Sequence, residues 1–313
     1  MSVYNAGQYL GQAIESILRQ SFSDFEFIII EDCSTDDSLR VIQHYAAQDR
    51  RIKLIQKPEN KRMKGFIENL NLGLKYAKGK YIARMDADDI SHPDRFEKQV
   101  KFLDENPETF MVGSAINFID ENNEFIKTLK ALPDNEAIQK QMPKKIAMYH
   151  PAIMFRNEPN IAYRDKIYYC EDYDLYLRLM LEGKKFANFE EALLDYRLLN
   201  SSISRKDGNF IRTLFVEKMK QFWRERKQKG TDSYEDFSPE TLLNILKSDE
   251  VSSKDDMKLA LSIATKYRYT KEFNALMTKY NRYYPSDSYI DTLKILNRLL
   301  IVAAKLFFKI SQN

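Results

Sequence analysis

The chain has 313 residues, of which 43% are hydrophobic and 30% charged, and its mean hydropathy is −0.54. This composition is typical of a globular protein with one large domain or two modest ones. The formal net charge of +3 argues against nucleic acid as the main partner, and two cysteines are too few for a disulfide framework or a cysteine-ligated metal site.

Strand-like and helix-like segments alternate along the first hundred residues. The run Phe25–Ile30 is continuously apolar, which is typical of a central parallel strand. Such alternation predicts a mostly parallel sheet with helices on its faces. The expected elements are a helix capped by Asn5 and Gln8, a strand at Phe25–Ile30, a helix through Leu39–Tyr45, a strand at Ile52–Ile55, a helix at about Lys64–Ala77, a strand from Tyr81, and a helix with Pro93 in its first turn and a capping box of Ser91 and Asp94.

Acidic residues follow two of these strands. Asp32 comes directly after the first apolar strand, and Asp86 and Asp88 follow the strand that starts at Tyr81. Ligands of parallel sheets bind outside the carboxyl ends of the strands. Carboxylate oxygens suit Mg²⁺ or Mn²⁺, so we favour a metal–nucleotide site over the alternative of a solvated acidic turn.

A third acidic group opens a later helix, after short strands at Phe110–Asp120 and Ala152–Phe155. In the segment Cys170–Leu179, Asp172 and Asp174 fall in the first helical turn, and Leu175 and Leu179 are expected to face inward. Acids at this place interact favourably with the helix dipole, which is one explanation. The other is a carboxylate base that points into the cleft.

The ordered set of motifs resembles the inverting nucleotide-sugar glycosyltransferases of family 2, which have the GT-A fold. That resemblance covers residues 4–204 and implies a Rossmann-like, mostly parallel mixed sheet flanked by helices. Residues 205–313 would then form a helical C-terminal extension. The motifs that carry the resemblance are Val3-Tyr4-Asn5-Ala6, Glu31-Asp32-Cys33-Ser34-Thr35-Asp36, Asn71-Leu72-Gly73-Leu74, Ala77–Ile82, Asp86-Ala87-Asp88, His150–Arg156 and Glu171-Asp172-Tyr173-Asp174.

The resemblance also implies a role for individual residues. Asp32 would bind the base of the donor, Asp86 its ribose side, and Asp88 a divalent metal, Mn²⁺ or Mg²⁺. Asp172 would be the general base, with a pKa raised by neighbouring acids. Tyr4 and Asn5 would belong to the nucleotide-sugar site, and the candidate supporting residues are Glu171, Asp174, Arg197 and His150. A structural role for His150, beside Pro151, is an equal alternative.

The sequence departs from the family pattern in three places. The apolar first strand is almost absent, which we interpret as a start codon assigned too late or, alternatively, a truncated chain. Tyr196-Arg197-Leu198-Leu199 lacks the histidine of Tyr-Arg-x-His, and Leu70-Asn71 replaces an Arg-Asn pair. A neighbouring basic side chain (Lys61, Arg62 or Lys64) could replace the phosphate contact that the missing arginine would make. Tyr196-Arg197 and Ser201–Ser204 form either a loop that closes over the diphosphate or an ordinary strand exit.

The C-terminal third is basic, with 21 Lys+Arg and 14 Asp+Glu in residues 201–313. We expect a long amphipathic helix at Phe210–Arg226, a polar linker, three further helices at Glu240–Lys247, Lys254–Tyr267 and Thr270–Arg282, and a last helix at Ser288–Ile310. The last helix is too short and too basic to span a bilayer. It either packs on its neighbours or lies at an anionic membrane surface near a lipid-linked acceptor.

The resulting hypothesis is a metal-dependent glycosyltransferase of cell-surface polysaccharide synthesis. It would move a hexosyl or N-acetylhexosaminyl group from a nucleotide sugar, and a UDP-sugar is the favoured donor. The acceptor would be a saccharide or a lipid-linked saccharide. No secretion signal is recognised, so we expect the cytoplasm, at the inner face of the membrane if the last helix binds there. The alternative is a non-catalytic nucleotide-sugar-binding or scaffold protein. A nucleotidyltransferase is disfavoured because the chain lacks a Gly-rich phosphate loop.

Overall fold

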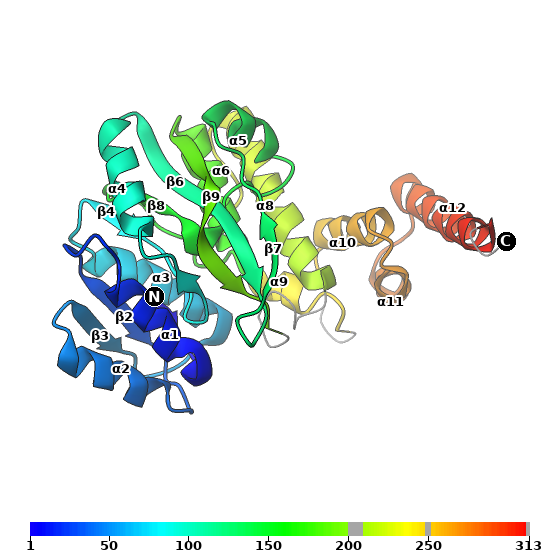
Figure 1. Ribbon diagram of the computed structural model, residues 1–313. Coiled ribbons are helices and arrows are strands. Elements are labelled where there is room, and N and C mark those ends of the chain that lie inside the picture. The colour runs from blue at the N-terminus through cyan, green and yellow to red at the C-terminus, as the bar shows by residue number, and fades with distance from the viewer. Residues whose placement is uncertain (200–208, 248–251, 311–313) are drawn as a thin grey trace. The chain divides into compact units, whose positions relative to one another are not determined.

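The computed structural model describes residues 1–199, 209–247 and 252–310 (Figure 1), and side chains only as far as residue 300. The chain divides into two compact units, which are described separately. Unit 1 comprises Met1–Asp165 and Glu171–Ser202, and unit 2 comprises Lys166–Cys170 and Ile203–Asn313.

Unit 1 begins with a parallel three-stranded sheet of order β1-β2-β3. Phe27, Ile29 and Ile30 are buried on β2, which confirms the central apolar strand expected there. Each strand is followed by a helix, as the alternating pattern predicts. The elements are β1 (Ser2–Val3), α1 (Gly7–Leu18), β2 (Phe27–Glu31), α2 (Ser38–Gln48), β3 (Ile52–Gln56) and α3 (Arg62–Tyr76).

The rest of unit 1 is built on a second sheet, of order β4-β8-β6-β9-β5 with β7 on β6. Among the described residues of this sheet, β6 and β9 pair in parallel, and the other ladders are antiparallel. The elements are β4 (Tyr81–Ala83), β5 (Ile90–Ser91), α4 (Arg95–Glu105), β6 (Thr109–Ile119), β7 (Phe125–Leu129), α5 (Asn135–Gln141), the short 3₁₀ helix η1 (His150–Ala152), β8 (Met154–Arg156), α6 (Glu171–Leu181) and β9 (Lys185–Arg197).

One hydrophobic core extends across both sheets of unit 1. Val3 and Ile29 come from the first sheet, Val112 and Leu194 from the second, and Leu10 from α1, and all five are buried. Burial of apolar surface is worth roughly 25 cal/mol per Å², so a shared core of this kind makes the two sheets one cooperative body. The strand ends that carry the acidic motifs are therefore held by a common core, which includes Met85 and Ala87 from the turn after β4.

Two predicted helix caps are wrong. The helix expected after Asn5 starts at Gly7, and neither Asn5 nor Gln8 caps it through its side chain. The helix expected around Pro93 starts at Arg95, with Asp94 as an N-cap that makes no side-chain hydrogen bond, while Ser91 lies in β5. In both cases a tertiary contact outweighs the local capping preference, because Asn5 and Ser91 bond instead to residues far away in sequence.

Unit 2 is helical in its described residues. On α8, Leu214, Phe215, Met219 and Phe222 are buried, which confirms the predicted apolar face. Tyr168, from the short segment that joins this unit, stacks on Phe215 with ring centroids 5.5 Å apart. Helix α9 is shorter than expected, and the others begin and end within three residues of the prediction. The helices are α8 (Asn209–Lys229), α9 (Pro239–Leu243), α10 (Lys254–Lys266), α11 (Thr270–Tyr283) and α12 (Ser288–Ile310).

The described helices include none that is both long enough and apolar enough to cross a membrane. Helix α12 nevertheless exposes three aliphatic side chains, those of Ile295, Leu296 and Leu299.

Candidate active site

The two turns that follow β1 and β2 are tied together by hydrogen bonds. The amide of Thr35 donates to Asn5 Oδ1 at 2.8 Å, and the amide of Asn5 donates to Ser34 Oγ at 3.1 Å. Asp36 accepts from the amide of Gly7 at 3.0 Å, so the same turn also receives the start of α1. Asn5 adopts a left-handed backbone conformation (φ 51°), which asparagine tolerates better than most residues. Tyr4 stands beside this joint with half of its surface exposed.

Asp32 is buried behind this joint and already has polar partners. Its Oδ1 lies 3.1 Å from Lys57 Nζ, and its Oδ2 accepts a hydrogen bond from Asn60 Nδ2 at 3.1 Å. The loop that follows β3 therefore supplies both of these partners of Asp32. Lys61, which we expected to replace a missing phosphate contact, pairs with Glu59 and Glu68 instead.

The turn after β4 gathers three acids in different surroundings. Asp86 Oδ2 lies 2.5 Å from Arg84 Nη1, in a pair whose arginine side chain is only 11% exposed. Burial, with the charge of Asp86 as the second cause, raises the pKa of Asp88 to about 6. Asp89 is buried and accepts the amide of Arg197 at 3.0 Å, as expected for a structural acid of the turn. Asp86 and Asp88 are therefore the acids of this turn that remain for a ligand.

Arg197 does not belong to a mobile loop, contrary to one of the two readings of its segment. It is 1% exposed, at the end of β9. Its Nε donates to the carbonyl of Asp88 at 2.9 Å and its Nη1 to the carbonyl of Asp120 at 3.0 Å, while the guanidinium stacks on Tyr9. Arg197 thus fixes the backbone of the acidic turn through the carbonyl of Asp88. Ser201–Ser204, the other part of that expectation, lie outside the described residues.

The start of α6 carries the second acidic group. Asp172 Oδ1 accepts the amide of Tyr173 at 2.7 Å, and Asp172 keeps part of its surface exposed. Burial, together with the charge of Asp172, raises the pKa of Glu171 to about 8. Asp174, a candidate supporting residue, is buried between Arg178 Nε, at 2.8 Å, and Arg164 Nη1, at 3.7 Å. Two cations neutralise Asp174, so Glu171 is the neighbour that acts on Asp172.

A wall of three aromatic residues lies beside these acids. His150 Nε2 is 2.8 Å from the hydroxyl of Tyr163, and the rings of His150 and Tyr176 meet edge to face. Burial lowers the pKa of His150 well below its usual value, so the ring is neutral at pH 7. Asn71 holds Tyr163 in place, because its side chain bonds to both the amide and the carbonyl of Tyr163 at 2.8 Å. His150 is therefore a buried, neutral member of the wall.

Arg84, the acid after β4 and the acids at the start of α6 act electrostatically on one another or on the same groups. The charges of Arg84, Asp172, Glu171 and Asp86 all act on the pKa of Tyr163, which burial raises beyond its usual range. The sequence pointed to the acids but missed Arg84, Tyr163 and Tyr176. The place of Arg84, two residues before Asp86, was a signal that could have been used, whereas the tyrosines lie in no recognised motif.

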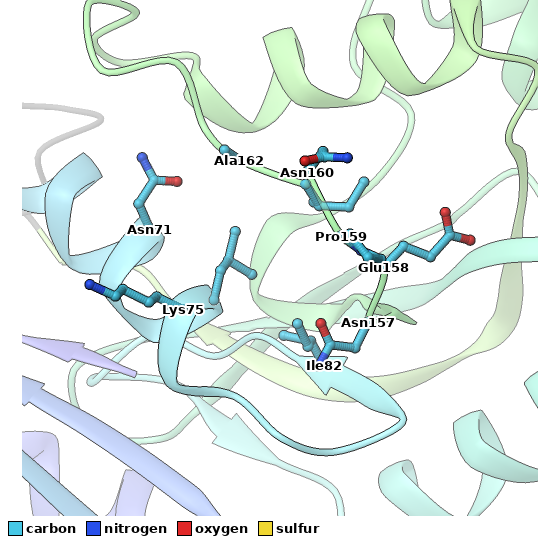
Figure 2. Close-up of a pocket in the computed structure, with 10 residues that line it drawn as sticks. Asn71, Lys75, Ile82, Asn157, Glu158, Pro159, Asn160 and Ala162 are labelled. Carbon is cyan, nitrogen blue, oxygen red and sulfur yellow. The ribbon is translucent and has the colours of Figure 1, made fainter.

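Two cavities flank this site. One, of about 480 Å³, lies between α3 and residues 157–162 (Figure 2). Two side-chain amides that line it already have protein partners, since Asn71 bonds to Tyr163 and Asn157 bonds to the carbonyls of Ala77 and Gly79. The other, of about 760 Å³, lies between β2 and β4 and extends to Arg84 and Tyr163. Neither cavity is lined by Asp88 or Asp172, so we assign no donor site to them.

The acidic turn has the chemistry of a divalent-cation site. The described residues contain no group of three or more His, Cys, Asp or Glu side chains that could hold a metal ion by themselves. Burial, and after it the charge of Asp86, raises the pKa of Asp88, so added positive charge beside these acids would favour the ionised form of Asp88. A cation shared with the oxygens of a bound ligand would relieve this repulsion, so the residues fit a metal.

Comparison with known proteins places these motifs in a family. Residues 1–168 match the family described as Glycosyl transferase family 2. The chain is 39% identical over 219 residues to the O-antigen biosynthesis glycosyltransferase WbnJ of Escherichia coli, an alignment that covers 66% of this chain and 80% of WbnJ. Among solved structures, S. aureus TarS 1-349 in complex with UDP-GlcNAc has a TM-score of 0.58 at 15% identity, with 90% of this chain and 89% of TarS covered. The mannosyltransferase PcManGT from Pyrobaculum calidifontis, in complex with GDP-Man and Mn²⁺, has a TM-score of 0.53 at 13% identity, with 95% and 85% covered. The two structures share the fold with this chain.

The Glu171 carboxyl predicts a characteristic pH dependence of stability. Its pKa in the folded protein, about 8, is above its ordinary value of 4.5, so its stabilising contribution is complete below pH 4.5 and is lost as the pH rises through 8. Glu171→Gln should remove that loss, so the melting temperature of the variant should rise relative to wild type between pH 5 and pH 8. Glu182→Gln, at an exposed residue just after the same helix, is the control. A difference between Glu171→Gln and wild type that stays constant with pH would contradict the assignment.

Proposed function

The chain belongs to glycosyl transferase family 2 and is a glycosyltransferase, and on this basis we propose that unit 1 moves a sugar from a UDP-sugar to a saccharide or lipid-linked acceptor. The relative WbnJ acts in O-antigen biosynthesis, which supports a role in cell-surface polysaccharide synthesis. The TarS structure holds UDP-GlcNAc, which supports a hexosyl or N-acetylhexosaminyl donor linked to UDP.

One observation carries this proposal. Carboxylates from two segments far apart in the sequence, Asp86 after β4 and Glu171 and Asp172 at the start of α6, all act electrostatically on the pKa of Tyr163. Bringing like charges together in a poorly solvated place costs free energy, so a fold that does so at its ligand-binding edge points to a chemical use. The two acid pairs have separate tasks in the proposed reaction.

The reaction is a single displacement at the anomeric carbon of the donor sugar. An acceptor hydroxyl forms the new carbon–oxygen bond, and the bond to the departing nucleoside diphosphate breaks with its electron pair on the phosphate oxygen. Asp172 takes the proton of the acceptor hydroxyl as general base. Asp172 suits this role because its side chain is partly exposed at the helix start, whereas Glu171 is buried with a pKa of about 8. Such a displacement inverts the anomeric configuration.

We propose that the donor lies across the three turns of the site. Asp32 would bind the base, next to the exposed ring of Tyr4 and the joint formed by Asn5 and Thr35. Asp86 would face the ribose. Asp88 would hold Mn²⁺ or Mg²⁺, and the likeness to the Mn²⁺ complex of PcManGT supports this. When bound, the metal supplies positive charge to the leaving diphosphate.

We further propose that α12 brings the protein to an anionic membrane surface. Ile295, Leu296 and Leu299 are exposed on this helix, and the basic residues Lys294 and Arg298 alternate with them. Aliphatic side chains beside basic ones are what a helix needs to lie in the headgroup region of anionic lipids. This position would suit a lipid-linked acceptor.

Variants of the two acid pairs should fail in different ways. Asp172→Asn removes the base but no donor contact, so sugar transfer should fall by roughly 10²–10⁴-fold while UDP-sugar binding is kept. Asp88→Ala removes the metal ligand, so donor binding itself should lose its dependence on Mn²⁺. Calorimetric titration of the donor with and without Mn²⁺, together with a transfer assay, separates the two results.

The matched control is Asp94→Asn, because Asp94 pairs with Lys98 at 2.7 Å on α4 and has no proposed role. Full transfer by Asp172→Asn would refute the base assignment. Unchanged Mn²⁺-dependent binding by Asp88→Ala would refute the metal assignment.

The membrane proposal predicts selective binding to charged lipids. The 313-residue chain should sediment with vesicles that contain phosphatidylglycerol more than with pure phosphatidylcholine vesicles, and Leu299→Asp should reduce this binding. Ile126→Asp, at an exposed aliphatic residue of β7, is the control and should bind like wild type. Equal sedimentation of wild type and Leu299→Asp would show that α12 is not the contact.

A further inference from the structure

We propose that Tyr169 is a positioning residue for the reaction, because it forms a strained turn, held within unit 2, from which the chain enters α6. In this place it sets where the proposed base, Asp172, stands. The inference rests on the proposed role of Asp172, and it gives the helical unit a task in the reaction itself.

The chain that leads into α6 is short and belongs to unit 2. This entry segment, Lys166–Cys170, clusters with the helices of unit 2, whereas the next residue, Glu171, opens α6 in unit 1. Asp172 follows Tyr169 by three residues. A change of backbone conformation at Tyr169 is therefore transmitted by the chain itself to the first turn of α6.

The beginning of the entry segment is fastened to the loop after α8. The amide of Lys166 donates to the hydroxyl of Tyr234 at 3.2 Å, and its Nζ donates to the carbonyl of Glu235 at 2.7 Å. Tyr234 in turn packs edge to face on Phe222 of α8, with ring centroids 6.1 Å apart. All of these partners lie in unit 2, so the segment starts from a point fixed within that unit.

Two neighbouring tyrosines of the entry segment pack on one ring of α8. Tyr168 stacks on Phe215, and Tyr169 meets the same ring edge to face, each with ring centroids 5.5 Å apart. Phe215 is buried and also contacts Phe237 edge to face. Aromatic pairs of this geometry are favourable beyond the area that they bury, so the end of the segment has a fixed partner.

Tyr169 has a backbone conformation that a tyrosine rarely adopts. Its φ of 67° lies in the left-handed region, where the β-carbon of any residue other than glycine is crowded. The thiol of Cys170 donates back to the carbonyl of Tyr168 at 3.6 Å, which closes the turn around Tyr169. Such conformations persist only when the surrounding structure holds them, and they are frequent at functional sites. The ring contact with Phe215 supplies that support here.

The turn matters because the first turn of α6 carries two acids in different surroundings. Glu171 is buried, whereas Asp172 is partly exposed. Successive residues of an α-helix differ in direction by about 100°, and a base must lie within roughly 3 Å of the proton that it takes. A small rotation or unwinding of this turn would therefore move Asp172 out of reach, while buried Leu175 and Leu179 keep the rest of α6 in the core. The proposed donor contacts come from other elements and would be kept.

The test compares Tyr169→Ala with Tyr169→Gly in the 313-residue chain, by hydrogen exchange and by transfer from UDP-GlcNAc with Mn²⁺. Both variants lack the ring, but glycine adopts a φ of 67° without strain and alanine does not. Tyr169→Ala should speed exchange in the peptide 171–176 and lower kcat by up to roughly 10²-fold, the cost of a misplacement of about 1 Å, with the donor KM unchanged. Tyr169→Gly should lie closer to wild type in both measurements.

Three further variants show whether unit 2 provides the support. Tyr169→Phe keeps the ring and should behave like wild type. Phe215→Ala removes the partner ring on α8, so it should act like Tyr169→Ala. The matched control is Phe210→Ala, at another buried ring of α8, which should lower stability without changing exchange in the peptide 171–176.

The proposal is overturned if Tyr169→Gly does no better than Tyr169→Ala, as a role in packing alone would require, or if Phe215→Ala and Phe210→Ala behave alike. If Phe215→Ala does not fold, the Tyr169 variants decide. Exchange in the peptide 171–176 needs no activity. A wild-type chain that transfers no sugar would therefore contradict the proposed function, and the exchange results would still support or overturn the role of Tyr169.

Discussion

The repulsion between carboxylates at the edge of unit 1 is the constraint on which the rest of its structure depends. Asp88 and Glu171 both have raised pKa values because burial and neighbouring acids disfavour their charge. The fold offsets this with the buried guanidinium of Arg84 and with fixed hydrogen bonds around the acids. In the proposed reaction, a metal ion at Asp88 and a proton moving to Asp172 would reduce the same repulsion. The repulsion that destabilises the free protein at this edge would therefore favour metal binding and proton transfer.

Buried arginines give the site its geometry, and each has a different task. Arg197 ties the turn after β4 to the end of β9 through the carbonyl of Asp88. Arg95 donates a hydrogen bond to the backbone carbonyl of Arg84 and so fixes the backbone from which the Arg84 side chain extends. Hydrogen bonds from a charged donor to several carbonyls are stronger than neutral ones and leave few orientations open. The acidic turn is therefore rigid before any ligand binds, which agrees with a site that must place a donor and an acceptor together.

The sequence was sufficient for the order of elements and for the acids, but not for their partners. The continuous apolar strand β2 and the acids after β2 and β4 follow from periodicity and strand ends. Asn5 looked like a helix cap because its local pattern fits one, yet it bonds to Thr35, some thirty residues away. Asp174 was a candidate supporting residue, and the sequence did not show that it pairs with Arg164 and Arg178. Local patterns do not show which distant side chain meets an acid, so these partners required the structure.

The anomeric configuration of the product tests the central claim most directly. The purified chain would be given UDP-α-GlcNAc, Mn²⁺ and a saccharide acceptor, and the new linkage would be read from the proton coupling of its anomeric carbon by nuclear magnetic resonance. A single displacement with Asp172 as base predicts a β-linked product. An α-linked product would contradict the account, because it requires a second displacement or a different geometry of attack.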